Sequence, residues 1–523
     1  MDDTSPASVR SISAKRRWII KSRRRHASAL LAIAATFAAW GSPHFVQAQD
    51  PAGAPQRPII AIEGVAVVDV ARGEIASPRT VLVGDGQITA IGEPATIDIP
   101  PAAVRVDGRG RFLMPGLVDM HVHLFNNASR RAPNEWTFPL FVANGVTGVR
   151  EMLTEPAAMT VVDRWRTKMA RGELVAPRVL AAGASVSAES EEATRRQVRE
   201  AKTAGVDFLK IFSQTREPQW RAILDEAGAL KIPVCGHIPA EVGLLDAANA
   251  GQRSNEHLTQ IYEACSAREK QFLDARKGLD GREIVKLRDA QEPEVLESFD
   301  QPICDRAAAA LAKTDQVQVP TLVLSHFEAR GSPAKFRDDP RWRCLRSDEQ
   351  ARWERILKDY PPGGKKLSAR RWEISRRIVK TLHAAGVRIL AGTDAPMPLV
   401  YPGYALHKEL ELLVEAGLSP ADALRSATIW PAEFLGLSDS SGSIAVGKRA
   451  DLLLLDANPL SDISHTQRIR AVVLKGRLLQ RADLDALSDA AITSEAKQPV
   501  NPYPSRRGAV PSCYEDRDFD NFL

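Results

Sequence analysis

Two hydrophobic patterns divide the chain. In residues 58–113, short apolar runs are separated by Gly-Asp-Gly and Asp-Gly pairs, which predicts β-strands joined by tight turns. Segments of the same kind return near the other end, in "SGSIAVGKRADLLLLDANPL" and "RIRAVVLKGRLLQ". We therefore expect residues 49–113 and 437–484 to form the two parts of one small β-sandwich.

Residues 114–436 follow a different pattern. Apolar runs such as "VTGVREM", "VDFLKIF" and "GVRILAGTDAP" recur there, mostly with helix-patterned stretches such as "EEATRRQVREAKTAG" between them. Strands that alternate with helices indicate a parallel βα array, and seven or eight such units are typical of a closed barrel. The sequence thus predicts an α/β fold, a (β/α)8 TIM-like barrel with a small composite β-sandwich.

Two segments fall outside this alternation. Residues from about 263 to 315 are charged and helix-patterned, and we expect them to form an insertion between two barrel units. Residues 485–523 are rich in Ser, Pro and Arg, which predicts a disordered tail.

The first 48 residues predict a signal peptide. A basic stretch is followed by an apolar run at residues 27–40, which is shorter than the roughly 20 residues that a membrane span needs. Val46, Gln47 and Ala48 fit a small-x-small cleavage site. We expect export to the periplasm or the medium, with no membrane attachment after cleavage; a retained N-terminal anchor is the alternative.

The charge of the chain is concentrated in that segment. The whole chain has 70 Lys and Arg against 65 Asp and Glu, and residues 1–48 hold eight of the basic and two of the acidic side chains. The remainder has 62 basic (70 − 8) and 63 acidic (65 − 2) side chains and is nearly neutral. No basic field is left to favour a nucleic-acid partner.

The five cysteines show no Cys-x-x-Cys spacing, which argues against a zinc knuckle. Cys265, Cys304 and Cys344 lie in one region of the chain, and an oxidising compartment would permit a disulfide among them. The sequence leaves open which two would pair.

Side chains that can bind metal end several predicted strands. His121 and His123 in "MPGLVDMHVHLF" are two residues apart, so on a strand both face the same side. His237 in "CGHIP", His257 in "SNEHL" and Asp394 in "GTDAP" each follow an apolar run, at the position where barrel enzymes carry their catalytic groups. One such histidine is usually an ordinary packed residue, but the whole set predicts a metal centre.

Lys210 in "VDFLKIF" shares a face with Val206 and Phe208, so it points into the barrel if Phe208 does. An ammonium group in a barrel interior is costly unless it is paired. Either Lys210 pairs with a nearby carboxylate or reaches the rim, or its neutral amine reacts with carbon dioxide. The resulting carbamate has two oxygens that can bridge two metal ions.

Together the motifs "PGLVDMHVHL", "VDFLKIF", "CGHIP", "SNEHL", "GTDAP" and "GSIAVGKRADLLLLDANPL" resemble those of the amidohydrolase superfamily of metal-dependent hydrolases, over about residues 58–480. The similarity is greatest to the branch of imidazolonepropionase-like and Xaa-Pro-dipeptidase-like proteins. This resemblance implies the barrel with its composite β-sandwich and a pair of divalent metal ions.

The resemblance also implies a role for each residue. His121, His123 and Asp394 would bind the more buried ion, His237 and His257 the second, and carboxylated Lys210 would bridge the two. Zinc is favoured by this donor set, although manganese, iron or cobalt would suit the same atoms. The insertion follows the His257 unit directly and could cover the pocket.

The implied reaction is hydrolysis of a C–N bond in an amide, a cyclic amide or a dipeptide such as Xaa-Pro. A hydroxide bridging two ions would attack the carbonyl, with Asp394 as general base and then general acid. The substrate would be a small molecule or a dipeptide, and a homo-oligomer is left open. Two alternatives remain: a mononuclear deaminase-like or cyclic-amidine hydrolase in which Lys210 carries no carbamate, and a barrel that has lost catalysis and serves as a binding scaffold.

Other polar residues have a functional and a structural interpretation. Asp119 and Glu256 are candidate acceptors behind the imidazoles, and we expect Arg150 and Glu151 to pair with each other. His383 and His465 are expected at the surface. Candidates for substrate contact, each with plain packing as the alternative, are Tyr401, Tyr404, His407 and His326.

Overall fold

The computed structural model describes residues 57–125, 133–331, 338–359 and 366–493. The chain divides into two units, residues 1–44 and 45–523, and all described residues belong to the second. The predicted signal peptide lies outside the described residues. Within the described ranges, no helix has both the length and the hydrophobicity that crossing a membrane requires.

Five parallel strands form a curved sheet in the order β11-β10-β9-β8-β7. They are β7 (Leu117–Val122), β8 (Val146–Glu151), β9 (Arg178–Ser185), β10 (Phe208–Ile211) and β11 (Val234–Gly236). The next two strands, β12 (Ser254–Glu256) and β13 (Val317–Val319), pair in parallel with each other.

Backbone hydrogen bonds close this sheet into a barrel. The Arg253 N–H donates to the Val234 carbonyl at 2.7 Å, which joins β12 to β11. An eighth, irregular segment contacts β13 on one side, where the Leu390 N–H donates to the Gln318 carbonyl at 2.9 Å. On its other side the Met120 N–H of β7 donates to the Ala391 carbonyl at 2.9 Å. The predicted TIM-like barrel is thereby confirmed.

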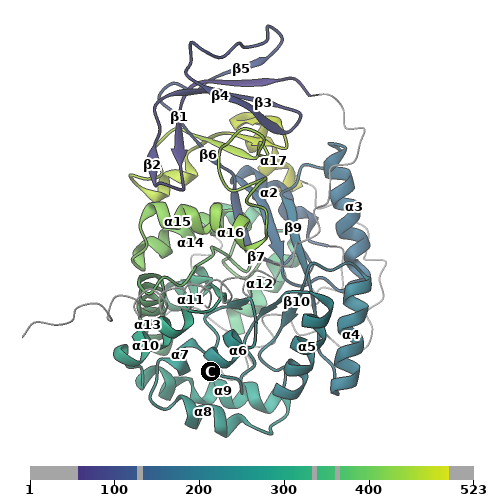
Figure 1. The fold of residues 1–523 in the computed structure, drawn as a ribbon, viewed down its shortest axis with the longest axis vertical. Helices are drawn as coiled ribbons and strands as arrows, with labels where there is room; N and C mark the ends of the chain where they lie inside the picture. Colours follow the sequence, from purple (N-terminus) through teal and green to yellow (C-terminus); the bar gives the residue numbers. More distant parts are fainter. Residues whose placement is uncertain (1–56, 126–132, 332–337, 360–365, 494–523) are drawn as a thin grey trace, which may run out of the picture. The chain divides into compact units, whose positions relative to one another are not determined.

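Helices alternate with the barrel strands and lie outside them (Figure 1). The helix α4 shows how the sequence produces them: Ser190 caps its first turn by accepting the Ala193 N–H at 3.3 Å, and the buried positions Thr194, Val198 and Ala201 recur at helical spacing. The helices are α2 (Phe138–Ala143), α3 (Met159–Ala170), α4 (Glu191–Thr203), α5 (Glu217–Leu230), α6 (Leu244–Asn249), α13 (Lys366–Ala384), α14 (Tyr404–Glu415), α15 (Pro420–Ser426) and α16 (Ile429–Phe434), with 3₁₀ turns η2 (Glu135–Thr137), η3 (Pro156–Ala158), η5 (Pro340–Cys344) and η6 (Ile463–Gln467).

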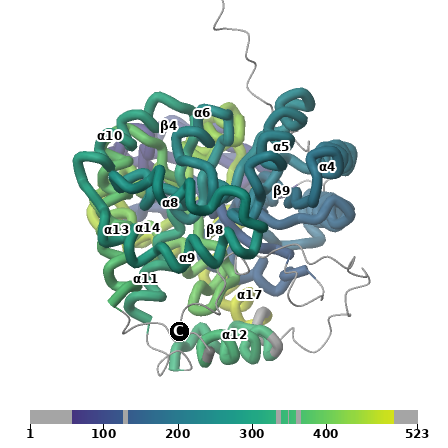
Figure 2. The backbone as a smooth tube through the Cα atoms, turned by 90° about the horizontal axis from the view of Figure 1, so that it is seen from below, coloured from purple at the N-terminus to yellow at the C-terminus, as the bar shows by residue number. Residues whose placement is uncertain are grey.

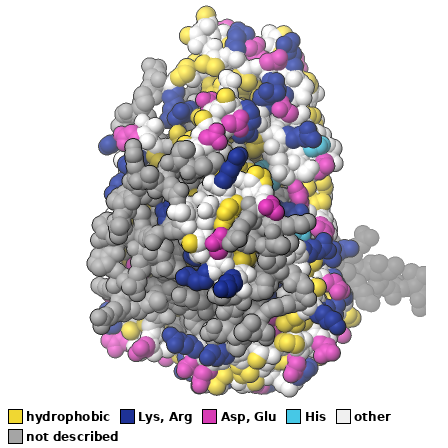
Figure 3. All heavy atoms as spheres, turned by 180° about the vertical axis from the view of Figure 1, so that it is seen from behind, with side chains coloured by type: hydrophobic (Ala, Val, Ile, Leu, Met, Phe, Trp, Pro, Cys, Tyr) yellow, Lys and Arg dark blue, Asp and Glu magenta, His cyan; other side chains and the backbone are white. Residues whose placement is uncertain are grey.

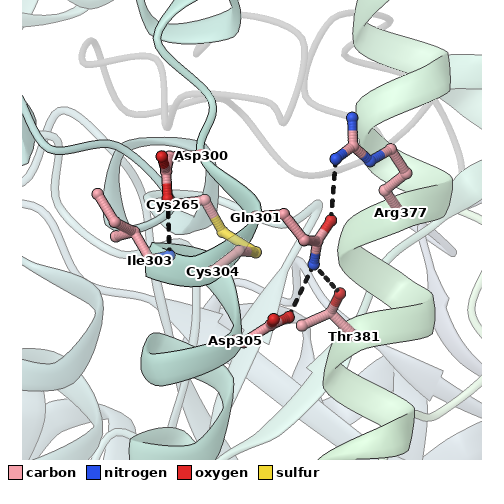
Figure 4. The surroundings of a disulfide bond; sticks show 8 residues. All are labelled: Cys265, Asp300, Gln301, Ile303, Cys304, Asp305, Arg377 and Thr381. Carbon is pink, nitrogen blue, oxygen red and sulfur yellow. Dashed lines mark hydrogen bonds between the residues drawn. A yellow bond between two sulfur atoms is a disulfide. The ribbon is translucent and has the colours of Figure 1, made fainter.

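The segment predicted as an insertion contains four helices, α7 (Ile261–Ala264), α8 (Glu269–Arg276), α9 (Gly281–Glu297) and α10 (Gln301–Leu311). A disulfide joins Cys265 to Cys304 at its base (Figure 4). Cys344 is a free, buried thiol. In α8, the buried Arg276 donates to the Ala240 carbonyl at 2.9 Å, just beyond His237. Figure 2 shows α8 and α9 crossing in front of the barrel strands.

Helix α10 is also tied to the barrel helix α13. The Gln301 side chain accepts a hydrogen bond from Arg377 at 3.1 Å and donates to Thr381 at 2.7 Å, as Figure 4 shows. Between β13 and α13 the chain forms two further helices that the hydrophobic pattern did not predict, α11 (Leu322–Arg330) and α12 (Ser347–Asp359).

The two flanks of the barrel build one flanking β-domain, in the strand order β16-β15-β14-β6-β1-β3-β4. Strand β14 of the C-terminal flank pairs with β6 of the N-terminal flank, with Leu454 opposite Leu113. Gly64, at φ +66°, lies at a register shift in β1, which pairs with β5 before the shift, with β6 after it and with β3 on both sides. The strands are β1 (Ile60–Asp69), β2 (Glu74–Ile75), β3 (Arg79–Gly84), β4 (Gln87–Gly92), β5 (Val104–Asp107), β6 (Phe112–Pro115), β14 (Leu452–Leu455), β15 (Ile469–Leu474) and β16 (Arg477–Gln480).

The predicted start of the disordered tail is wrong. Residues 485–493 belong to the helix α17 (Arg481–Thr493), which packs on α2 and buries Leu484. The apolar positions of this helix find a partner only in the folded protein, so composition alone did not reveal it. Residues 494–523 lie outside the described residues.

On the face drawn in Figure 3, basic and acidic side chains of the described residues are interspersed. This distribution agrees with the near neutrality of the chain after residue 48 and does not favour a polyanionic partner.

Candidate active site

Three of the predicted metal ligands form a close group. His121 lies on β7, His123 directly follows that strand, and Asp394 comes from the eighth barrel segment. One Asp394 oxygen lies 2.7 Å from Nε2 of His123 and 3.3 Å from Nε2 of His121. A donor atom from each residue lies within 4.8 Å of the others, and all three side chains are buried. This geometry could hold a metal ion.

The other two predicted imidazoles continue this group. The ring of His257, after β12, lies 4.6 Å from that of His121 between centroids. The ring of His237, after β11, lies 4.9 Å from that of His257. The structure therefore brings all four histidines from three strand ends into one continuous cluster.

Lys210 of β10 is completely buried. Its Nζ lies 5.2 Å from the centre of the Phe212 ring. Its aliphatic chain passes over Gly236, where a Cβ atom would come within 2.9 Å of the lysine Cδ and 2.4 Å of the Ile211 carbonyl oxygen. Only a glycine at position 236, directly before His237, leaves room for the Lys210 side chain.

Oxygen atoms hold the Nδ1 side of three of the rings. Nδ1 of His121 lies 2.9 Å from a Glu256 oxygen, Nδ1 of His237 lies 3.2 Å from the Ser213 hydroxyl, and Nδ1 of His257 lies 2.8 Å from the Thr321 hydroxyl. A metal-binding histidine characteristically donates its second N–H to such a group. The donor set and its orientation therefore fit metal ions bound through Nε2.

Glu256 is paired with Arg150, and the predicted Arg150–Glu151 pair is wrong. The Arg150 guanidinium donates to both Glu256 oxygens at 2.9 and 3.0 Å, and both side chains are fully buried. Successive residues on a strand face opposite sides, so Glu151 points away and accepts the Leu153 N–H at 2.6 Å. Burial alone would raise the pKa of Glu256, but Arg150 and the hydrogen bond with His121 outweigh it and hold that pKa well below its usual range.

Asp119 connects two of the segments that carry predicted metal ligands. Its carboxylate accepts the Thr393 N–H at 3.0 Å and the Thr393 hydroxyl at 2.6 Å, which fixes the backbone just before Asp394. Burial raises the pKa of Asp119 to about 7, although the Thr393 hydrogen bonds lower it. Asp119 thus holds the backbone of the segment that carries Asp394 in place.

His407 has a structural environment. It is buried, its Nε2–H donates to the Asn144 carbonyl at 2.9 Å, and its Nδ1 lies 2.9 Å from the Thr466 hydroxyl. Burial lowers the pKa of His407 to about 4, so the ring is neutral. Both ring nitrogens bind protein groups, which corrects the expectation of substrate contact in favour of packing at the start of α14.

The remaining substrate candidates lie in aromatic clusters. Tyr401 packs on Trp353 with 5.1 Å between ring centres, and the Arg341 guanidinium lies 4.9 Å from the Tyr401 ring and 5.8 Å from that of Tyr404. Burial raises the pKa of the Tyr401 hydroxyl, which has no hydrogen-bond partner among the described residues.

His326 is half-buried on α11 against Trp372, 5.2 Å away between ring centres, and burial lowers the pKa of His326 to about 4. His383 and His465 are half-buried outside the cluster. His383 pairs with Asp422 at 3.4 Å, and Nδ1 of His465 lies 2.8 Å from the Asn458 carbonyl.

Sequence reasoning missed the oxygen atoms behind the rings, Ser213 and Thr321, and also Thr393. Thr321 directly follows the apolar run "VQVP", the same signal that identified the histidines, but a hydroxyl after a strand is too common to be singled out.

A (β/α)8 barrel with histidines and an aspartate at the carboxyl ends of its strands has the architecture of barrel enzymes, which carry their catalytic groups at these ends. The model of the amidohydrolase family matches residues 112–275 and 367–479. The chain belongs to the amidohydrolase family, and it is a hydrolase that acts on carbon–nitrogen bonds. The unmatched residues 276–366 contain α9, α10, β13, α11 and α12.

Individual proteins are similar over most of the chain. The imidazolonepropionase of Chromobacterium violaceum is 23% identical over 82% of this chain and 98% of its own length. A candidate prolidase from Bifidobacterium longum is 27% identical, with a TM-score of 0.55 over 84% of this chain and all of its own. The bottromycin amidohydrolase shares the fold, at 24% identity and a TM-score of 0.62 over 86% of this chain and 95% of its own.

Proposed function

We propose that this protein is an exported, metal-dependent hydrolase that cleaves the C–N bond of an amide, a cyclic amide or a dipeptide such as Xaa-Pro. The observation that carries the proposal is the cluster of four imidazoles and Asp394. In three of the four imidazoles, an oxygen atom lies within hydrogen-bonding distance of Nδ1. The imidazolonepropionase and prolidase relatives support a small-molecule or dipeptide substrate.

Each ligand has an assigned place in the proposal. His121, His123 and Asp394 would hold the first ion, and His237 and His257 the second. Lys210, as its carbamate, would bridge them, and its complete burial on β10, beside the strand that leads to His237, supports this. Zinc fits the nitrogen and oxygen donors.

Two divalent ions held there would act as Lewis acids, lowering the pKa of water and polarising a substrate carbonyl. The chain itself supplies the proton transfer. Asp394, whose oxygen faces the imidazoles of His121 and His123, would take a proton and later deliver it to the leaving nitrogen. The Arg150–Glu256 pair would keep Nδ1 of His121 protonated, and Asp119 with Thr393 would keep Asp394 in place.

A mononuclear hydrolase is the second candidate. The tight group of His121, His123 and Asp394 is by itself sufficient for one ion. In that case Lys210 would carry no carbamate, and the purified protein would bind one ion per chain.

The test is metal analysis of the purified mature protein, followed by a screen of N-acyl amino acids, Xaa-Pro dipeptides and lactams. We expect about two ions per chain and hydrolysis of at least one class. Asp394→Asn should lower kcat by roughly 100-fold or more, the range of general acid–base catalysis. His383→Gln, outside the cluster, is the matched control and should keep full activity. Protein that binds metal yet hydrolyses no member of the panel would favour a binding scaffold.

Export is tested separately. The full-length chain should be found in the periplasm or medium with its N-terminus near residue 49, whereas a chain that lacks residues 1–48 should stay in the cytoplasm. An intact N-terminus on membrane-bound protein would support a retained anchor instead.

A further inference from the structure

A buried carboxyl group holds the start of a helix next to the candidate active site. Glu409 of α14 is completely buried. One of its oxygens accepts the Leu322 N–H at 2.9 Å, and the other accepts the Val323 N–H at 2.7 Å. These are the first two residues of α11, whose N-terminal N–H groups have no partner within the helix. Glu409 therefore performs, from another helix, the function of an N-cap.

Thr321 occupies the N-cap position of α11, but its side chain does not cap the helix. Its hydroxyl can donate to the Pro320 carbonyl at 2.8 Å, so its oxygen can accept Nδ1–H of His257, also at 2.8 Å. With the proton on Nδ1, Nε2 is the nitrogen of His257 through which a metal ion would be bound.

The backbone at Thr321 is strained. Its φ of +46° is left-handed, which a β-branched residue rarely adopts, and such a conformation costs about 1–3 kcal/mol. His257 itself has a φ of +59°, and its N–H donates to the Val319 carbonyl at 2.9 Å. A strained residue keeps its position only when its surroundings hold it, and Glu409 binds the two residues that follow Thr321.

We propose that Glu409 is a positioning residue for the second metal site. By fixing the first turn of α11, it fixes the Thr321 hydroxyl and, through that hydroxyl, the orientation and tautomer of His257. Glu409 acts through Thr321 and contacts neither substrate nor metal. The inference rests on the two-metal form of the proposed function.

The cost of burying the Glu409 carboxyl group also indicates that this residue has a specific role. Burial raises the pKa of Glu409 to about 8, against the lowering effect of the two N–H groups. A buried carboxyl group is costly to keep in a core, and an apolar side chain could not accept these N–H groups. The acidic residues on the outer face of the same helix have ordinary surface roles: Glu411 pairs with Lys408 at 3.0 Å, and Glu415 pairs with Arg376 at 3.2 Å.

The experiment compares Glu409→Gln with Glu411→Gln in the full mature protein. Glutamine has the shape of glutamate, but it places an NH₂ group against one of the helix N–H groups. We expect Glu409→Gln to bind its second ion 10- to 100-fold more weakly, the usual effect of removing support from a metal-binding histidine. The first ion should remain, and Glu411→Gln should bind both ions as the wild type does.

The readouts do not depend on activity. Metal content is measured after timed exposure to a chelator, and the visible spectrum of Co²⁺-loaded protein reports the ligand geometry at each site. Circular dichroism shows whether the variant is folded. If Glu409→Gln does not fold, Thr321→Val removes the hydroxyl directly and should cause the same loss of one ion, whereas Thr321→Ser should restore it.

The outcomes separate the two proposals. If the wild type binds two ions and neither Glu409→Gln nor Thr321→Val weakens the second, the inference about Glu409 is wrong and the proposed function is untouched. If the wild type binds only one ion, the two-metal function fails first, and this inference fails with it.

Discussion

Replacing Arg150 by methionine tests the role of the buried ion pair behind His121. Arg150 and Glu256 are both fully buried, with N–O distances of 2.9 and 3.0 Å. The guanidinium carbon also lies 5.6 Å from the centre of the Phe208 ring and 5.5 Å from that of Phe434. Methionine fills much of the same space but leaves the Glu256 carboxylate without its cation, and breaking such a buried pair costs about 3–5 kcal/mol.

The same change should act on the metal site. Without Arg150, burial becomes the dominant influence and raises the pKa of Glu256 toward protonation. A protonated Glu256 can donate to Nδ1 of His121, which would move the ring proton to Nε2, the atom required for the metal. We therefore expect metal affinity to fall about 10- to 100-fold in addition to the loss of stability.

Urea unfolding of the metal-stripped protein measures the first effect, and competition with a chelator measures the second. Arg199→Met is the control, because Arg199 is 52% exposed and pairs with Glu226 at 3.0 Å, a contact worth about 0–1 kcal/mol. The double variant Arg150→Met/Glu256→Gln should recover part of the stability, since it removes the buried charge. The reasoning is refuted if Arg150→Met destabilises the protein no more than Arg199→Met does.

Three further predictions concern other parts of the chain. Lys210→Ala should lose metal and turnover together and regain part of both with short carboxylic acids, whereas unchanged metal content and turnover would remove the carbamate from the proposal. Cys265→Ser should lower the free energy of unfolding by about 3–4 kcal/mol, the loop-closure value for the 39-residue separation, as measured by urea unfolding, while Cys344→Ser should change it little. His407 is neutral in the fold because burial lowers its pKa from 6.5 to about 4, so unfolding takes up a proton below pH 6.5; its contribution of up to about 3 kcal/mol is present above that pH and is lost as the pH falls to 4. Unfolding free energies measured between pH 7 and pH 4 should therefore fall less steeply in His407→Gln than in the wild type, and equal slopes would contradict this assignment.

The barrel could be predicted because its signal is local. Each βα unit carries its own apolar run and its own helical periodicity, as at Thr194, Val198 and Ala201 of α4, and these depend only on neighbouring residues. The metal-binding candidates were equally visible, since a histidine at the end of an apolar strand can be recognised within a few residues. The eighth segment was visible as the apolar run before Asp394. Its irregular backbone, which is held by hydrogen bonds to both neighbouring strands, was not predicted.

Partners across the barrel could not be predicted in this way. Arg150 lies next to Glu151 in the sequence and yet binds Glu256, because a strand turns adjacent side chains to opposite faces. The sequence offers three cysteines, and only the packing of α7 against α10 selects Cys265 and Cys304.

The sequence by itself determined the alternation of barrel strands and helices, though not α11, α12 or α17, and the residue types at the strand ends, because these follow from periodicity over a few residues. The tertiary structure alone decided which oxygen faces Nδ1 in three of the four imidazoles: Glu256 for His121, Ser213 for His237 and Thr321 for His257. Barrel closure brings these pairs together from separate strands, and no local pattern records such a contact.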